Sequence, residues 1–177
     1  EIAQAAERAG ASVITRPAAL ATDTSTSESG WLHAVNHLQT QGKDTSVIAG
    51  LQATSPRRLP SDFDNAVRIF ESEALDSLFS GSVFDDLTLW EKQRYGALHA
   101  VNHDPVRRVR RQEAPLQIVE NGSLYLMKSA LLKKSGTRFA GRIGYAPNRA
   151  WQMTEIDSPE GAELAEIIMR RYVLGMS

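Results

Sequence analysis

Apolar side chains recur along the chain with two different spacings, which predict alternating helices and strands. Spacings of three and four residues, typical of amphipathic helices, predict helices over residues 1–9, 31–39, 61–70, 130–134 and from Ser158 onward. Short apolar runs predict strands over residues 11–15, 46–52, 77–83, 124–127 and 139–143. Because the two kinds of element alternate, we expect an α/β fold of three layers, in which helices cover both faces of a mixed, mainly parallel sheet.

One stretch of the chain departs from this alternation. Residues 85–115 show no sustained periodicity, and a stretch of this length without a pattern inside a compact chain is usually functional or part of an interface. It holds the most basic cluster in the sequence, which consists of Arg107, Arg108, Arg110 and Arg111. Guanidinium groups bind carboxylates and phosphates through paired hydrogen bonds, so this cluster indicates an anionic ligand.

Length and composition narrow the classes of protein. The 177 residues, 42% of them hydrophobic, are enough for one good core, so a single domain over residues 1–177 is expected. The net charge of -1 gives no general attraction to nucleic acids or anionic membranes, and the arginine cluster lacks the interleaved aromatic residues of a nucleic-acid site. The absence of cysteine excludes disulfides and thiolate metal sites and fits a reducing compartment. With no apolar run long enough for a bilayer and no leader-like start, we expect a cytoplasmic protein without nucleic-acid or membrane partners.

The most informative segment is Leu51–Arg58, which directly follows a predicted strand. It places polar groups at the carboxyl end of that strand, where open α/β sheets bind their ligands. The segment resembles the signature Leu-Gln-Pro-Thr-Ser-Pro-Leu-Arg of the CMP-N-acylneuraminate synthetases, which are N-acylneuraminate cytidylyltransferases. It departs from that signature at Ala53, where the family usually has proline, and at Arg57, where it usually has leucine.

Four further motifs that resemble this family follow in the family's order. They are Arg16-Pro17 with Ala21–Ser25, Arg111–Glu113, Glu120–Tyr125 and Glu155–Glu160. The resemblance implies a Rossmann-like fold of the nucleotide-diphospho-sugar transferase type. It also implies an enzyme that transfers CMP from CTP to the anomeric hydroxyl of an acylneuraminate-type sugar acid and releases pyrophosphate, with Mg²⁺ as cofactor.

The resemblance has two further implications for organisation. The family opens with a strand and a loop containing Gly, Arg and Lys that holds the nucleotide phosphates, and nothing before Glu1 supplies it. We therefore expect an amino-terminally incomplete domain that, on its own, binds CTP weakly and turns over slowly or not at all. Residues 85–115 would form a dimerisation arm of a homodimer.

An acidic pair late in the chain is the candidate metal site. Glu155 and Asp157 alternate on a short extended segment, so both carboxylates are expected to point the same way. Two hard oxygen donors suit Mg²⁺, which completes its shell with water and phosphate oxygens. The spacing alone favours two solvated acids before a helix. The resemblance implies that both residues bind the metal and that Asp157 is catalytic.

The remaining site residues come from the resemblance. It implies that CTP is bound by Arg16 and Ser27, which the sequence alone would describe as a turn arginine and a helix cap. It implies that the sugar acid is bound by Gln52, Arg111, Asn121, Tyr125 and Phe139. Arg111 would hold the sugar carboxylate in the active site of the other subunit. Asn121-Gly122 also fits an ordinary turn that leads into a strand with a buried Tyr125.

Other interpretations stay open. His33 and His37 lie one helical turn apart, a geometry able to hold a transition metal, but no third ligand has matching spacing. The sugar could be a related acid of the KDO, legionaminate or pseudaminate type. The chain could also be a non-catalytic binding domain on the same scaffold, which would bind no nucleotide.

Overall fold

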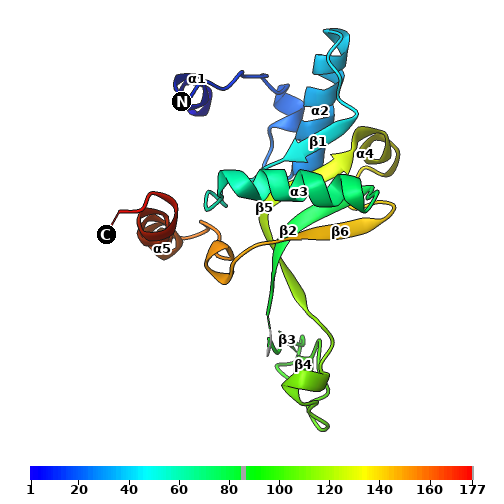
Figure 1. Ribbon diagram of the computed structural model, residues 1–177, viewed down its shortest axis with the longest axis vertical. Coiled ribbons are helices and arrows are strands. Elements are labelled where there is room, and N and C mark those ends of the chain that lie inside the picture. Colours follow the sequence, from blue (N-terminus) through cyan, green and yellow to red (C-terminus); the bar gives the residue numbers. More distant parts are fainter. Residues whose placement is uncertain (85–86, 177) are drawn as a thin grey trace. The chain divides into compact units, whose positions relative to one another are not determined.

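The computed structural model describes every residue except Asp85, Asp86 and Ser177 (Figure 1). Its α-helices are α1 (Ile2–Arg8), α2 (Ser27–Thr40), α3 (Pro60–Ser72), α4 (Ser129–Ser135) and α5 (Pro159–Ile168). Its strands are β1 (Val47–Gly50), β2 (Ser77–Val83), β3 (Trp90–Lys92), β4 (Leu98–Ala100), β5 (Ile118–Lys128) and β6 (Ile143–Pro147). Short 3₁₀ turns occur at Ala18–Leu20, Arg111–Glu113 and Ala150–Gln152, and a π-helical turn, Met169–Val173, follows α5. The α/β class predicted from the sequence is confirmed.

Local capping explains why the helices begin where they do. Ser158 accepts a hydrogen bond from the backbone N of Gly161 at 3.0 Å, with Pro159 at the first helical position, as the sequence predicts. At α2 the cap is Thr26, whose side chain accepts from Ser29 N at 3.2 Å. Ser27 is therefore the first helical residue, and its interpretation as a cap is wrong by one position.

Two of the predicted strands are wrong. Residues 11–15 form no strand, because a strand exists only where a neighbour supplies hydrogen bonds and none pairs with this segment in the described chain. The last strand begins only at Ile143. Gly141 has a φ of +66°, in the left-handed region, which is incompatible with an extended strand through this position.

The main sheet has four strands in the order β1-β5-β2-β6. β5 is antiparallel to β1, with Val47 opposite Lys128 and Gly50 opposite Tyr125. It also runs antiparallel to β2, since Lys128 N donates to Asp76 O at one end and Phe84 N donates to Gln117 O at the other.

β2 and β6 form a parallel pair, since β2 is bonded through Ser77 N to Arg142 O at its start and through Gly81 O to Asn148 N near its end. β1, β2 and β6 therefore run in one direction, and β5 runs against them. The sheet is therefore mixed, as predicted, but two of its three neighbouring pairs are antiparallel, because the reversed strand β5 lies inside the sheet. The expectation of mainly parallel pairing is wrong. The reason is the connection between β2 and β5, which returns directly to the neighbouring position instead of crossing over through a helix.

That connection contains a feature the sequence did not reveal. β3 and β4 pair antiparallel, with Trp90 opposite Ala100, and form a separate two-stranded sheet. The side chain of Asn102 fixes its base: its Oδ1 accepts from Leu89 N at 2.8 Å, and its Nδ2 donates to Leu87 O at 2.7 Å and to Gln117 Oε1 at 3.1 Å. Three strand residues on each side are too few to give a recognisable alternation.

The chain divides into two compact units. The first comprises residues 1–50, 66–78 and 125–144, and the second comprises residues 51–65, 79–124 and 145–177. The core of the first unit is apolar and contains Val35, Ala66, Phe70, Leu75, Leu78, Tyr125, Leu126, Met127 and Leu132. In this unit α2 packs against α4.

The second unit buries mainly polar side chains. Its buried polar residues are Ser55, Arg57, Ser80, Ser82, Asn121, Ser123 and Gln152, beside the apolar Leu124, Ala146 and Ala165. Buried polar groups are stable only when hydrogen-bonded, so this region is specified by a network and not by hydrophobic packing alone. In the described part of the chain, no helix combines the length and hydrophobicity needed to cross a bilayer.

Candidate functional site

The loop that carries Gln52 is held by the guanidinium of Arg58. Its Nε donates to the backbone O and the Oγ of Ser123, both at 3.0 Å, and its Nη2 donates to Gln52 O at 2.7 Å and Ser55 O at 2.8 Å. Burial lowers the pKa of Arg58, but its value in water is far above neutrality and the group stays charged. The side chain of Arg58 thus links Gln52 to Ser55 within the loop and bonds the loop to β5.

Gly122 is the point where the site residues meet. Its φ is +65°, and a Cβ there would lie 2.6 Å from Gln52 Oε1 and 3.2 Å from Ser55 Oγ, and would also collide with the carboxylate of Glu155. Only glycine leaves room for these three polar groups. The sequence suggested an ordinary turn at Asn121-Gly122, but both residues lie inside β5.

Glu155 approaches from a segment that runs alongside the Gln52 loop. Ile156 N donates to Thr54 O at 2.8 Å, which positions the carboxylate of Glu155 beside Gly122. Burial raises the pKa of Glu155, and the negative charges of Asp157 and Glu120 raise it further, while Arg57 opposes them. Glu155 therefore lies in the electrostatic field of Asp157.

The acidic pair offers a divalent cation two carboxylates at most. Within the described residues, no three His, Cys, Asp or Glu side chains gather in a metal-binding arrangement. Mg²⁺ commonly takes only one or two carboxylates and completes its octahedron with water and phosphate oxygens. The same finding leaves His33 and His37 without the further ligands that a transition-metal site needs.

Asn121 is a buried structural link. It is 1% exposed, and its Nδ2 donates to Asn148 Oδ1 at 2.8 Å, while its Oδ1 accepts from Ser80 Oγ at 2.6 Å and from Ser123 N at 3.2 Å. Ser55 Oγ donates to its backbone O at 3.0 Å. Its side chain is thus fully engaged within the second unit, and its predicted contact with a sugar would require part of this network to open.

In the first unit, Arg16 and Ser27 line one cavity of about 310 Å³. Gly30 and Trp31 also line it, and the side chain of Arg16 lies against Gly30, where a Cβ would be 3.4 Å from Nη1. The two residues predicted to bind the nucleotide are thus brought together. His33, whose buried Nδ1 has no hydrogen-bond partner among the described residues, contributes to the same cavity.

Tyr125 and Phe139 also meet in the first unit, with ring centroids 6.1 Å apart at an angle of 69°. The guanidinium of Arg138 lies 4.5 Å from the centre of the Tyr125 ring and 4.9 Å from that of Trp31, which are cation–π distances. Its Nε donates to Glu28 Oε1 at 2.6 Å, and both side chains are about 15% exposed. This hydrogen bond lowers the pKa of Glu28. The Arg138–Glu28 ion pair thus lies against the aromatic cluster.

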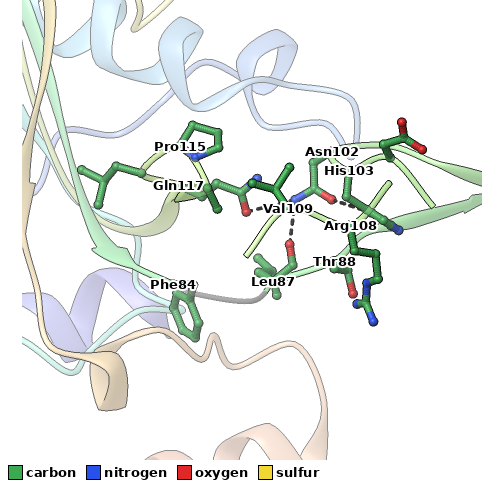
Figure 2. Close-up of a pocket in the computed structure, with 12 residues that line it drawn as sticks. Phe84, Leu87, Thr88, Asn102, His103, Arg108, Val109, Pro115 and Gln117 are labelled. Atoms are coloured by element: carbon green, nitrogen blue, oxygen red, sulfur yellow. Dashed lines mark hydrogen bonds between the residues drawn. The ribbon is translucent and has the colours of Figure 1, made fainter. Parts of the chain in front are cut away.

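Figure 2 shows a further cavity, of about 540 Å³, in the segment that follows β2. The cavity is lined by the apolar side chains of Phe84, Leu116 and Val109 and by Arg108. The amide of Asn102, which also lines it, is hydrogen-bonded to Leu87 and Gln117. Arg111 begins a 3₁₀ turn, Arg111–Glu113, in this segment.

The sequence analysis missed three features of the candidate site: the crowding at Gly122, the Arg138–Glu28 ion pair and the burial of Arg57. The first had a signal, since Asn-Gly dipeptides favour positive φ. The other two had none, because the residues of the ion pair are 110 positions apart and an arginine is ordinarily expected at the surface.

Comparison with known proteins shows which proteins the chain is similar to. No protein-family model matches the chain. N-acylneuraminate cytidylyltransferase A of Danio rerio is 30% identical over 174 residues, which cover 97% of this chain and 39% of the relative. N-acylneuraminate cytidylyltransferase of Oncorhynchus mykiss is 28% identical over 137 residues, 76% of this chain and 31% of the relative. The resemblance found in the motifs is confirmed: over nearly its whole length the chain is similar to N-acylneuraminate cytidylyltransferases. It spans less than half the length of these relatives.

The crowding at Gly122 predicts the effect of Gly122→Ala. Both Gly122→Ala and Gly96→Ala place a Cβ at positive φ, which costs about 1–2 kcal/mol, but the space around Gly96 is open. Gly122→Ala must also displace Gln52, Ser55 and Glu155, so its free energy of unfolding should fall at least about twice as far. Urea unfolding of both variants measures this, and equal losses would contradict the convergence at Gly122.

The Arg138–Glu28 pair predicts a pH effect. Because the pKa of Glu28 lies below its ordinary 4.5, the pair stabilises the fold above that pH, and the contribution is lost as pH falls through the lowered value. Glu28→Gln should cost about 1–3 kcal/mol at pH 7, with the difference from wild type shrinking below pH 4.5. Thermal unfolding from pH 3 to 7, with Glu163→Gln as an exposed control, tests this; a gap independent of pH would refute it.

Proposed function

We propose that the chain is the acidic-sugar-activating part of a cytidylyltransferase, which transfers CMP from CTP to the anomeric hydroxyl of an acylneuraminate-type sugar acid and releases pyrophosphate. The observation that carries the proposal is the meeting of Gln52 and Glu155 at Gly122, since it joins two separate family motifs at one place. The similarity over 97% of the chain to N-acylneuraminate cytidylyltransferase A supports it. The proposal includes the three-layer, nucleotide-diphospho-sugar transferase-like scaffold and a cytoplasmic location.

In the second unit, the chain's own groups would orient the sugar and hold the metal. The amide of Gln52, fixed because Arg58 binds its backbone, offers a donor and an acceptor to sugar hydroxyls. Glu155 and Asp157 would hold Mg²⁺ together with phosphate oxygens. When bound there, the ion would neutralise the charge that develops on the phosphates during transfer.

In the first unit, the proposed roles concern recognition. Arg16 and Ser27, which share a cavity, would read cytosine, because a guanidinium donates to its O2 and N3 and a hydroxyl can accept from its amine. Tyr125 and Phe139 would cover an apolar edge of the sugar, such as the methyl of an acyl group. Arg138, packed on Tyr125, would close that cluster and limit the size of the acyl group it accepts.

Substitution of Asp157 tests the proposed reaction. CTP with Mg²⁺ should raise the melting temperature of the wild type more than ATP with Mg²⁺ does, and pyrophosphate release should require an acylneuraminate. Asp157→Asn should lower the Mg²⁺-dependent rate at least about 100-fold with folding intact, because it removes an anionic ligand from the charge-stabilising centre. Asp64→Asn, an exposed change of the same kind, should have no effect.

Two outcomes would count against the proposal. Failure of every nucleotide to shift the melting temperature would favour a non-catalytic binding domain. Full activity of Asp157→Asn would remove the metal assignment. A panel of sugar acids in the same assay, including KDO, legionaminate and pseudaminate types, distinguishes the related cytidylyltransferases.

We further propose that residues 85–115, of which the structure describes 87–115, form the dimerisation arm of a homodimer and that Arg111 binds the sugar carboxylate in the partner's site. The segment exposes large apolar side chains, among them Tyr95 at 94%, Val106 at 88% and Leu98 at 63%. Exposed apolar side chains gathered in one segment are typical of an interface.

Leu98→Glu should weaken this dimer at least about tenfold, because a charge would be buried in the interface. Ile2→Glu makes the same change at an exposed apolar residue outside the segment and should not affect association. Sedimentation velocity over a concentration series measures both. A monomeric wild type, or equal weakening by both variants, would remove the interface from this segment.

A further inference from the structure

Arg57 is an unusual residue in the site because its charged group is buried. The family signature that the loop resembles has leucine here, and Arg57 is 1% exposed. Its Nη1 donates to Thr154 Oγ1, while its Nε and Nη2 are buried with no hydrogen-bond partner among the described residues. A buried guanidinium with two unused donors is costly, and an apolar side chain of similar size is often more stable in such a place.

The surroundings of Arg57 tie it to the acidic pair. Thr154, which accepts its hydrogen bond, directly precedes Glu155. The backbone O of Arg57 accepts from Gln152 Nε2 at 3.0 Å, and Thr54 O accepts from Ile156 N at 2.8 Å. The loop and the acidic segment are thus connected on both sides of Glu155, and this brings the guanidinium into the electrostatic field of that carboxylate.

An external anion is a poor match for the two unused donors. Both nitrogens are out of contact with solvent, so a phosphate or carboxylate would reach them only if the loop opened. Opening would break the bonds of Arg58 to Gln52 O and Ser55 O. The group that Arg57 can influence without any rearrangement is the carboxylate of Glu155.

We propose that Arg57 is an internal counter-charge to Glu155, which reduces the affinity of the Glu155–Asp157 pair for a divalent cation relative to a site with leucine at position 57. Arg57 is a positioning residue that acts through the field it imposes on the pair. The proposal rests on the proposed function, in which the pair binds Mg²⁺. A cation held a short distance from a divalent ion in a partly buried site weakens its binding by simple repulsion.

Metal binding measured directly tests the proposal. Mn²⁺, used as a paramagnetic substitute for Mg²⁺, is titrated into the wild type, Arg57→Leu and Arg57→Lys, with the free ion followed by electron paramagnetic resonance. Arg57→Leu should bind Mn²⁺ about five- to tenfold more tightly, and Arg57→Lys, which keeps the charge, within about twofold of the wild type. Arg8→Leu makes the same change of charge at an exposed position outside the proposed sites and should match the wild type.

Folding and metal binding separate the possible outcomes. Arg57→Leu should melt no lower than the wild type, since leucine removes two unused donors from the interior. A variant that folds but binds Mn²⁺ no more tightly than the wild type overturns the proposal, provided that Asp157→Asn abolishes binding. If Asp157→Asn binds Mn²⁺ like the wild type, or if no variant binds it, the metal site of the proposed function fails first and Arg57 loses this role with it.

Discussion

The constraint on which the second unit depends is the absence of a side chain at Gly122. Gln52, Ser55 and Glu155 belong to segments about 100 residues apart, and each places a polar group in the space a Cβ would fill. Around this point Asn121 hydrogen-bonds in four directions, and Gln152 bonds to Arg57 O and Asp62 Oδ2. Because nearly all of these groups are satisfied, the network defines one arrangement and not an ensemble.

The two units are stabilised by different physics. The first has a continuous apolar core, from which Trp31, Tyr125 and Phe139 form an aromatic cluster under Arg138. The second buries serines, amides and an arginine, and gains less from apolar burial. The first unit therefore carries an aromatic cluster beside an ion pair, and the second unit carries a buried hydrogen-bond network.

The sequence predicted the local features well and the long-range ones poorly. The start of α5 at Ser158-Pro159 and the bounds of β2 were predicted correctly, because caps and short apolar runs act within a few residues. The antiparallel pairing of β5 was not predicted, since it depends on a 34-residue connection that the local pattern does not describe. The motifs indicated Gln52 and Glu155, which lie together, but no pattern predicted that Arg57 would be buried beside them.

The way Arg58 holds its loop has a consequence for how the site can diverge during evolution. Three of its four hydrogen bonds go to main-chain carbonyls, of Gln52, Ser55 and Ser123, and these are present whatever side chains the neighbouring positions carry. Positions 53 and 57, the two departures from the family signature, are thereby free to mutate without losing the loop's shape. Selection can retune the chemistry at these positions one substitution at a time while the scaffold of the loop is inherited intact.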